Sequence, residues 1–236
     1  MSSRSRYTSP IHAGARFVAQ RGILRPAIWR MLTVTVLGQE KLAGVDGPFV
    51  VVSNHSSHLD APLIIGALPR KLARYVATGA AADYFFDVRW RKGLTSLFFN
   101  AFPVDRTGLR GRRGLATSLL DDGVPLLLFP EGTRSRTGEM GTFKPGAAAL
   151  CISRDVPCLP VAIVGANAAM PYGRNWPLRG RPPVWVTFGE PMRADDGETV
   201  SQFSERIAKE VSGLVDYTHD YRSSTGRPGD PRAELD

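Results

Sequence analysis

The chain contains the stretch Val50-Val51-Val52-Ser53-Asn54-His55-Ser56-Ser57-His58-Leu59-Asp60. Its apolar start predicts a buried β-strand, its middle predicts a polar turn, and the residues that follow predict a helix. In open α/β sheets, ligands bind at the carboxyl ends of the strands. The stretch therefore predicts a strand–turn–helix unit whose turn carries functional side chains.

On both sides of this stretch, short apolar runs alternate with longer helical patterns. The predicted strands are Thr33–Leu37, Pro48–Ser53, Ala73–Ala77, Phe102–Val104, Pro125–Phe129, Cys158–Val164 and Val184–Phe188. The predicted helices are Ala61–Leu68, Arg91–Phe99, Leu109–Leu120, Gly146–Ser153 and Val200–Tyr217. This alternation favours one three-layer α/β domain over residues 33–221, with a mostly parallel sheet. Residues 222–236 are rich in Gly, Pro and charge, which predicts a disordered tail.

The composition excludes several classes of protein. Apolar residues make up 43 % of the 236 residues and charged residues 22 %, which is typical of a globular chain. We find no uncharged apolar run of roughly 18 residues, so no membrane-spanning helix is expected. The two cysteines, Cys151 and Cys158, have no metal-binding spacing and are too few for a disulfide framework. A reducing compartment is therefore expected.

Positive charge is concentrated at the N-terminus. Residues 1–41 hold seven basic residues and one acidic residue, a balance of +6 out of the +8 of the chain. Apolar side chains and a tryptophan are interleaved with these arginines, and Pro26 is expected to divide the segment into two short helices. We interpret residues 1–32 as a basic amphipathic segment that lies on an anionic membrane surface. The alternative is a helix packed on the core with its arginines in water.

His55 and Asp60 form the first candidate catalytic pair. Five residues separate them, which on a regular helix would put them about 140° apart, so they must be joined across a turn. A carboxylate there fixes the imidazole tautomer and stabilises its protonated form, which makes His55 a candidate general base. Asp60 is also well placed to be the N-cap of the following helix. His58 adds a third possible metal ligand, but the remaining histidines lie near the termini, so we expect no metal site.

Polar side chains also follow two other predicted strands. Residues 129–136 read Phe-Pro-Glu-Gly-Thr-Arg-Ser-Arg, in which Arg134 and Arg136 are candidate ligands for a phosphate. Glu131 would orient an arginine or accept a hydrogen bond from a substrate hydroxyl, and Lys144 adds a cation near a helix start. An ordinary loop salt bridge is the alternative. The third strand ends in Asp105-Arg106.

With these segments, the chain resembles the 1-acylglycerol-3-phosphate acyltransferases and the wider glycerolipid acyltransferase superfamily. The family carries four blocks in a fixed order. They correspond here to Asn54-His55 through Asp60, Phe102-Pro103-Val104-Asp105-Arg106, the segment Phe129–Ser135, and Leu159-Pro160-Val161-Ala162-Ile163. The resemblance covers roughly residues 33–190.

The resemblance implies a reaction, a set of substrates and a location. His55, assisted by Asp60, would activate the free hydroxyl of a lysophospholipid for attack on the thioester of acyl-CoA or acyl-carrier protein. The acceptor would be bound by Arg106, Glu131, Gly132, Thr133 and Arg134, with Lys144 as an additional phosphate contact. No metal, organic cofactor or nucleic acid is implied. The protein would be cytoplasmic and peripheral on the inner face of the cell membrane.

Two residues depart from the family pattern. Many family members have a lysine where this chain has Thr78, and the glycine that often opens the second block is Asn100. Asparagine also tolerates left-handed backbone geometry, so the second change is mild. The missing lysine leaves another lysolipid or an alcohol open as the acceptor. A catalytically silent lipid-binding protein and a thioesterase also remain as alternatives.

Overall fold

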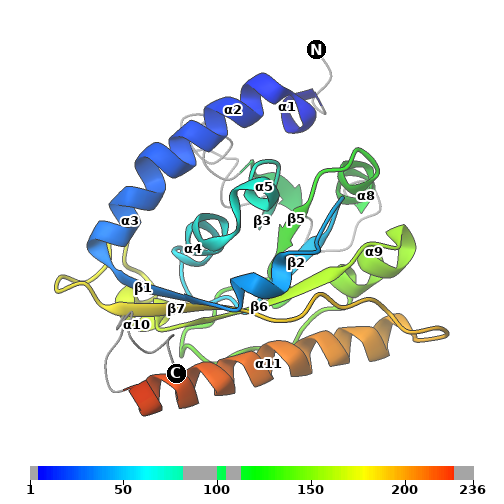
Figure 1. Ribbon diagram of the computed structural model, residues 1–236. Helices are drawn as coiled ribbons and strands as arrows, with labels where there is room; N and C mark the ends of the chain where they lie inside the picture. Colours follow the sequence, from blue (N-terminus) through cyan, green and yellow to red (C-terminus); the bar gives the residue numbers. More distant parts are fainter. Residues whose placement is uncertain (1–4, 82–99, 105–112, 226–236) are drawn as a thin grey trace.

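A computed structural model describes residues 5–81, 100–104 and 113–225, within which seven strands form one sheet (Figure 1). The strands are β1 (Thr33–Leu37), β2 (Val50–Ser53), β3 (Ala77–Ala81), β4 (Phe102–Val104), β5 (Leu126–Leu128), β6 (Cys158–Val164) and β7 (Pro183–Phe188). Their order is β1-β7-β6-β2-β5-β3-β4, and only the pair β6–β7 is antiparallel. The predicted α/β class with a mostly parallel sheet is confirmed.

Most predicted strands lie where the sequence places them, and one does not. Strand β3 begins at Ala77, where the predicted strand ends. The cause is the short helix α5 (Arg70–Ala73), which takes up Leu72 and Ala73 as buried core residues. Ala73 therefore ends a helix and Arg74 and Tyr75 form the turn that follows it, so the strand begins only at Ala77.

Helices cover both faces of the sheet and make a three-layer domain (Figure 1). The remaining helical elements of the domain are η2 (Gln39–Leu42), α4 (Asp60–Ala67), α8 (Arg113–Asp121), α9 (Gly146–Arg154), α10 (Ala166–Ala169) and α11 (Val200–Thr225). One core cluster joins the sheet to α4, α5 and α10, and the other joins its opposite face to α8, α9 and α11. Both clusters depend on the alternation of side chains along the strands: Val51 belongs to the first cluster, whereas Val50 and Val52 belong to the second.

The last helix, α11, is longer than its sequence pattern indicates. The sequence pattern predicts that it ends at Tyr217, but it continues to Thr225, so residues 222–225 are helical and not part of a disordered tail. Thr218 is fully buried, and its hydroxyl lies 2.8 Å from that of Thr187 in β7. The Arg222 guanidinium lies 5.3 Å from the ring of Trp185. These contacts with β7 hold the extra turns against the sheet.

The N-terminal helix consists of α1 (Ser5–Thr8) and the consecutive segments α2 (Pro10–Val18), η1 (Ala19–Leu24) and α3 (Arg25–Met31). Pro26 does not divide it, contrary to the prediction. Segment η1 is a π-helix, and the Arg25 N–H bonds the Gln20 carbonyl five residues earlier. This wider turn changes the hydrogen-bond register just before the proline and lets the helix continue without a break.

The arginines of this helix hold it to the body of the protein. Arg21 and Arg25 donate to carbonyls at the end of α4, among them that of Gly66, which accepts from both. Arg16 is buried and donates to backbone carbonyls of α1; burial lowers its pKa to about 10. Arg21 and Arg25 therefore bind the body of the protein and Arg16 binds α1, so the alternative of arginines in water is wrong for these three.

The outer face of the N-terminal helix is apolar. Ile11, Val18 and Ile23 have relative exposures of 83, 65 and 62 %. No helix among the described residues is long and apolar enough to cross a bilayer. The helix therefore presents exposed apolar side chains between Ile11 and Ile23, while Arg16, Arg21 and Arg25 face the protein and Arg30 is exposed.

Candidate active site

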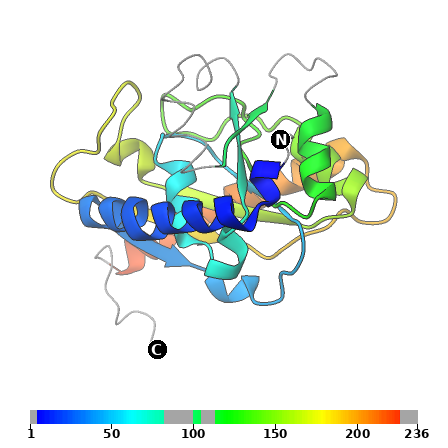
Figure 2. The same cartoon turned by 90° about the horizontal axis from the view of Figure 1, so that it is seen from above.

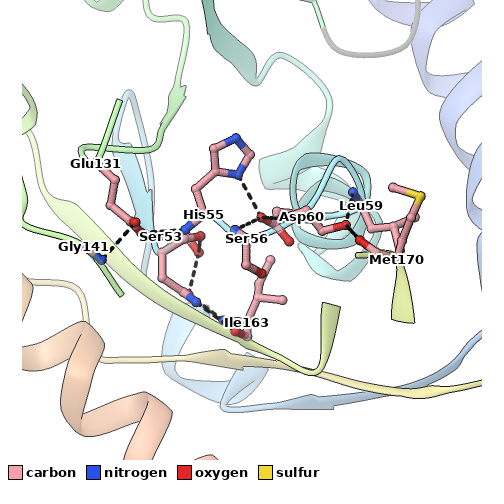
Figure 3. Close-up of polar contacts among 11 residues, drawn as sticks. Ser53, His55, Ser56, Leu59, Asp60, Glu131, Gly141, Ile163 and Met170 are labelled. Carbon is pink, nitrogen blue, oxygen red and sulfur yellow. Dashed lines mark hydrogen bonds and ion pairs between the residues drawn. The ribbon is translucent and has the colours of Figure 1, made fainter. Parts of the chain in front are cut away.

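His55 and Asp60 meet across the turn that joins β2 to α4. His55 Nδ1 lies 2.8 Å from Asp60 Oδ2, and Asp60 is completely buried (Figure 3). The turn is tight because the same oxygen also accepts the backbone N–H groups of Ser56 at 2.7 Å and Ser57 at 2.8 Å. The predicted pairing of histidine and carboxylate across a turn matches this geometry.

Asp60 is not the N-cap of α4. It is the first residue of the helix, and its carboxylate bonds the preceding turn instead of the helix N–H groups. Its position in the first turn still places its negative charge at the positive end of the helix dipole.

The contact with Asp60 determines which nitrogen of His55 is available for chemistry. An ionised carboxylate accepts a hydrogen bond, so Nδ1 is the donor and Nε2 carries the free lone pair. The ring stacks on Phe129 at the end of β5, with a centroid distance of 4.0 Å. Its side chain is 21 % exposed, and Figure 3 shows Nε2 on the side of the ring away from Asp60. The arrangement can accept a proton from a bound hydroxyl group.

Two further polar side chains fix the position of the His55 backbone. The Asn54 amide group bonds both the N–H and the C=O of Ile163 in β6, at 2.8 and 2.9 Å. Glu131 accepts the His55 N–H at 2.7 Å with one oxygen and the Gly141 N–H at 3.0 Å with the other. Glu131, a predicted ligand of the acceptor, thus joins two backbone segments of the site through its carboxylate. Burial raises its pKa, an effect that the two N–H bonds oppose.

Arg134 lies beside the turn that carries His55 and Asp60, because the next residue, Ser135, donates its N–H to the His55 carbonyl at 2.8 Å. Its guanidinium lies 4.8 Å from the ring of Tyr172, and that of Arg136 lies 5.2 Å from the same ring. Its positive charge also acts on His58, in the turn between His55 and Asp60. The structure thus places Arg134 beside the turn that carries His55 and Asp60, and a cation–π contact with Tyr172 holds its guanidinium.

The other residues predicted from this loop are spread over a wider area. Gly132 has φ +74°, and a Cβ atom at this position would lie 3.0 Å from Lys144 Nζ, so a side chain would be strained there. Lys144 is therefore next to the loop, as predicted. Thr133 is exposed and lines an open pocket of about 350 Å³ whose described lining includes neither His55 nor Arg134.

The second block is described only in part. Arg106 and the predicted helix Arg91–Phe99 lie outside the described residues. Asn100 adopts φ +50°, which agrees with the left-handed geometry expected of a residue that replaces glycine. Thr78 lies in β3 and is 5 % exposed, and its hydroxyl has no hydrogen-bond partner in the described part of the chain.

His58 is part of the same turn and is held in its neutral form. Its pKa is lowered from 6.5 to about 4, mainly by burial and further by the charges of Arg134 and His55. Below pH 6.5 the unfolded chain thus binds a proton that the folded chain binds only near pH 4. The free energy of unfolding should therefore fall as the pH falls from 6.5 to 4.

We expect His58→Gln to remove this contribution. Between pH 7 and pH 4, the wild type should lose on the order of 1 to 2 kcal/mol more stability than the variant, a figure reduced for the partial exposure of the imidazole. Urea denaturation of both proteins at pH 7, 5.5 and 4 measures the difference. Parallel loss of stability in the two proteins would contradict the assignment to His58.

Comparison with known proteins identifies the family. Residues 33–164, more than half of the chain, match the family model described as "Acyltransferase". The chain belongs to the acyltransferase family. The matched range includes His55, Asp60 and the whole loop from Phe129 to Ser135.

Several members of the acyltransferase family with known names are similar to the chain. A 1-acyl-sn-glycerol-3-phosphate acyltransferase of Chlamydomonas reinhardtii is 32 % identical over 148 residues, which cover 62 % of this chain and 43 % of that protein. A protein of Mycoplasma genitalium, described as a probable enzyme of the same name, is 36 % identical over 126 residues, or 52 % of this chain and 46 % of its own. The chain spans about half the length of the curated relatives it matches.

A solved structure confirms the fold. The crystal structure of the 1-acyl-sn-glycerophosphate (LPA) acyltransferase PlsC from Thermotoga maritima matches with a TM-score of 0.67 and 26 % sequence identity. The match covers 85 % of this chain and 79 % of that chain. The architecture described above is therefore that of an acyltransferase-family protein.

Sequence reasoning missed three residues of the site. Phe129 stacks on His55, and Asn54 joins the turn to β6. The strand register contains the signal for the first of these: β2 and β5 are parallel neighbours with Val52 opposite Leu128, so the residues just beyond the two strand ends meet. Tyr172 had no such signal because it follows β6 by way of a separate helix, α10.

Proposed function

We propose that the protein transfers a fatty acyl group from a thioester to the free hydroxyl of 1-acylglycerol-3-phosphate, giving phosphatidate. The observation that carries the proposal is the His55–Asp60 contact of 2.8 Å with Nε2 free on the exposed side. The names of the similar proteins support this choice of acceptor. The donor is acyl-CoA or acyl-carrier protein, since both present the same thioester.

In the proposed mechanism, His55 Nε2 takes the proton from the acceptor hydroxyl while its oxygen attacks the thioester carbonyl carbon. The C–O bond forms, the carbonyl becomes a tetrahedral oxyanion, and the C–S bond then breaks. The imidazolium returns the proton to the leaving thiolate, which leaves as a free thiol. Asp60 stabilises the imidazolium during this cycle through its bond to Nδ1. These steps need neither a metal nor an organic cofactor, because His55 transfers the only proton that moves.

We further propose that Arg134 and Lys144 bind the acceptor phosphate, with Arg106 as a third cation. Arg134 already lies beside the catalytic turn and offers a planar fork of donors to a phosphate. Lys144 lies against Gly132, so its ammonium borders the same loop. Glu131 and Gly132 contribute by shaping the loop backbone.

The membrane would be bound by the outward face of the N-terminal helix. This proposal depends on the exposed side chains Ile11, Val18 and Ile23 and not on the arginines, since Arg16 and Arg21 donate to backbone carbonyls of the protein. An apolar helix face of this kind partitions into the boundary between headgroups and acyl chains. The free thiols Cys151 and Cys158 are in keeping with the cytoplasmic leaflet.

Thr78 favours a second candidate acceptor. Thr78 has a buried hydroxyl without a partner in the described structure, at a position where many family members have a lysine. The site therefore has one positive charge fewer than the site of those members. A lysolipid with a less charged headgroup, or an alcohol, would then be the acceptor in the same reaction.

The test is the release of thiol from palmitoyl-CoA in detergent, with and without lysophosphatidate, for the wild type and Arg134→Ala. We expect release that depends on the acceptor, and a kcat/KM for lysophosphatidate roughly 100-fold lower in the variant. Arg154→Ala, which alters an exposed arginine at the end of α9 and outside the site, is the matched control. Release that does not need an acceptor would make the protein a hydrolase. No release with any acceptor or with acyl-carrier protein would make it a silent lipid-binding protein.

A further inference from the structure

A second surface, besides the N-terminal helix, has the chemistry of a membrane-binding element. It is the loop between α10 and β7, residues 171–182, which we call the Trp176 loop. Tyr172, Trp176 and Leu178 have relative exposures of 47, 72 and 38 %. The loop also holds exposed Arg174, Arg179 and Arg181 and no acidic residue.

We propose that the Trp176 loop inserts into the interface of an anionic bilayer and forms a second membrane contact beside the N-terminal helix. The inference rests on the proposed function, because it assumes that the acceptor is taken from a membrane. Tryptophan prefers the headgroup level of a bilayer, and arginines interleaved with apolar residues are attracted to anionic lipids. A tryptophan that is nearly three-quarters exposed otherwise places a large apolar ring in water without a partner on the protein.

The position of the loop agrees with this proposal. Arg181 Nη2 donates to the carbonyl of Trp29 in α3 at 3.4 Å, and the Thr33 hydroxyl donates to the Arg181 carbonyl at 3.1 Å. These bonds attach the base of the loop to the end of the N-terminal helix. Figures 1 and 2 both show the loop, in yellow, projecting outward at the α3 end of that helix. The loop therefore adjoins the α3 end of the N-terminal helix.

The loop is also joined to the candidate active site through Tyr172. The guanidinium groups of Arg134 and Arg136 lie against the Tyr172 ring. The Leu178 N–H donates to the Ala169 carbonyl at 2.8 Å, which holds the loop to α10. Insertion of the loop would therefore place Arg134, the proposed phosphate ligand, close to the headgroup plane. The phosphate of a lysolipid lies in that plane while its acyl chain stays in the bilayer. The loop thus orients the protein on the membrane surface as well as strengthening its binding to the membrane.

The experiment measures how the full chain partitions onto sedimented vesicles of equal parts phosphatidylglycerol and phosphatidylcholine. The double variant Trp176→Ala/Leu178→Ala is expected to bind at least tenfold more weakly than the wild type. Tyr217→Ala is the matched control, because Tyr217 is 54 % exposed on α11, which covers the opposite face of the sheet (Figure 1). This control should bind like the wild type.

The depth to which Trp176 inserts is measured with brominated lipids, which quench the fluorescence of nearby tryptophans. The chain has four tryptophans, so Trp176→Phe isolates the signal of Trp176 as a difference from the wild type. We expect that difference signal to be quenched on anionic vesicles and to recover when the protein is released by salt. An unquenched Trp176 on bound protein would overturn the proposal.

Other outcomes separate this inference from the proposed function. If Val18→Ser/Ile23→Ser releases the protein from vesicles and the Trp176 double variant does not, the loop proposal is wrong and the helix proposal stands. If the wild type binds no vesicles, both membrane proposals are wrong, whatever the assay in detergent shows. If the double variant binds vesicles normally but uses acyl-carrier protein poorly, the loop binds that acidic protein and the proposal is likewise overturned.

Discussion

Replacing His55 with alanine is expected to lower kcat for acyl transfer by roughly 10³-fold, because general-base catalysis contributes on this scale. In the variant, Asp60 Oδ2 would still accept its two backbone N–H groups. The Asn54 side chain would still bond Ile163, and the backbone N–H of residue 55 would still donate to Glu131. The backbone should therefore retain its position while the base is lost. Thiol release dependent on lysophosphatidate, together with a circular dichroism melting curve, measures both effects.

The matched control is His219→Ala, an identical change on the exposed side of α11. It should leave kcat within a factor of two of the wild type. A loss of less than tenfold in His55→Ala, with the fold intact, would show that another group removes the proton. A loss of activity accompanied by unfolding would instead indicate a structural role, which His55→Gln would then test with a side chain of similar size.

Asp60→Asn is expected to lower kcat by roughly 10²-fold and the free energy of unfolding by about 2 to 4 kcal/mol. The carboxylate is completely buried, and one of its oxygens accepts three hydrogen bonds. An amide can keep one oxygen in that position, but its NH₂ group then takes the place of Oδ1, which has no partner in the described structure. The variant thus gains a buried unpaired donor and loses the charge that stabilises the imidazolium.

Activity assays and urea denaturation at pH 7 measure the two effects separately. Asp196→Asn, which changes an exposed aspartate, serves as the control for both. Full activity in Asp60→Asn would mean that the contact with His55 only orients the ring. Wild-type stability would mean that the buried amide finds a partner that the carboxylate does not have.

The sheet could largely be predicted from the sequence, because each strand is a short apolar run with a clear boundary. Strand β6 matches its prediction from Cys158 to Val164, a run of buried residues that ends at a glycine. The start of β3 could not be predicted, since Tyr75 and Val76 favour a strand as strongly as the residues that follow. The length of α11 depends on contacts of Thr218 and Arg222 with a distant strand, which local periodicity does not contain.

The site could be predicted as a set of residues but not as a set of roles. His55 and Asp60 have the contact that their spacing and the resemblance imply. Glu131 has the residue type of a substrate ligand, yet both its oxygens bond backbone N–H groups of this chain. A carboxylate in a loop offers the same chemistry to a substrate and to the backbone, and the bonds to the backbone depend on the path of Gly141 past Glu131, which the sequence does not contain. Likewise, the sequence does not show that Arg16, Arg21 and Arg25 donate to backbone carbonyls of the protein instead of facing a membrane.

The paired bonds between Asn54 and Ile163 have a consequence for how the protein fluctuates. The side-chain amide acts as an additional peptide unit, so the hydrogen-bond ladder between β2 and β6 extends one step past the end of β2. We expect the residue that carries the imidazole to belong to the same cooperative unfolding unit as the centre of the sheet. Local opening events that expose loops should then leave His55 in place. The proposed base is then ready before any substrate arrives, and variation in the acceptor-binding segments can proceed without disturbing it.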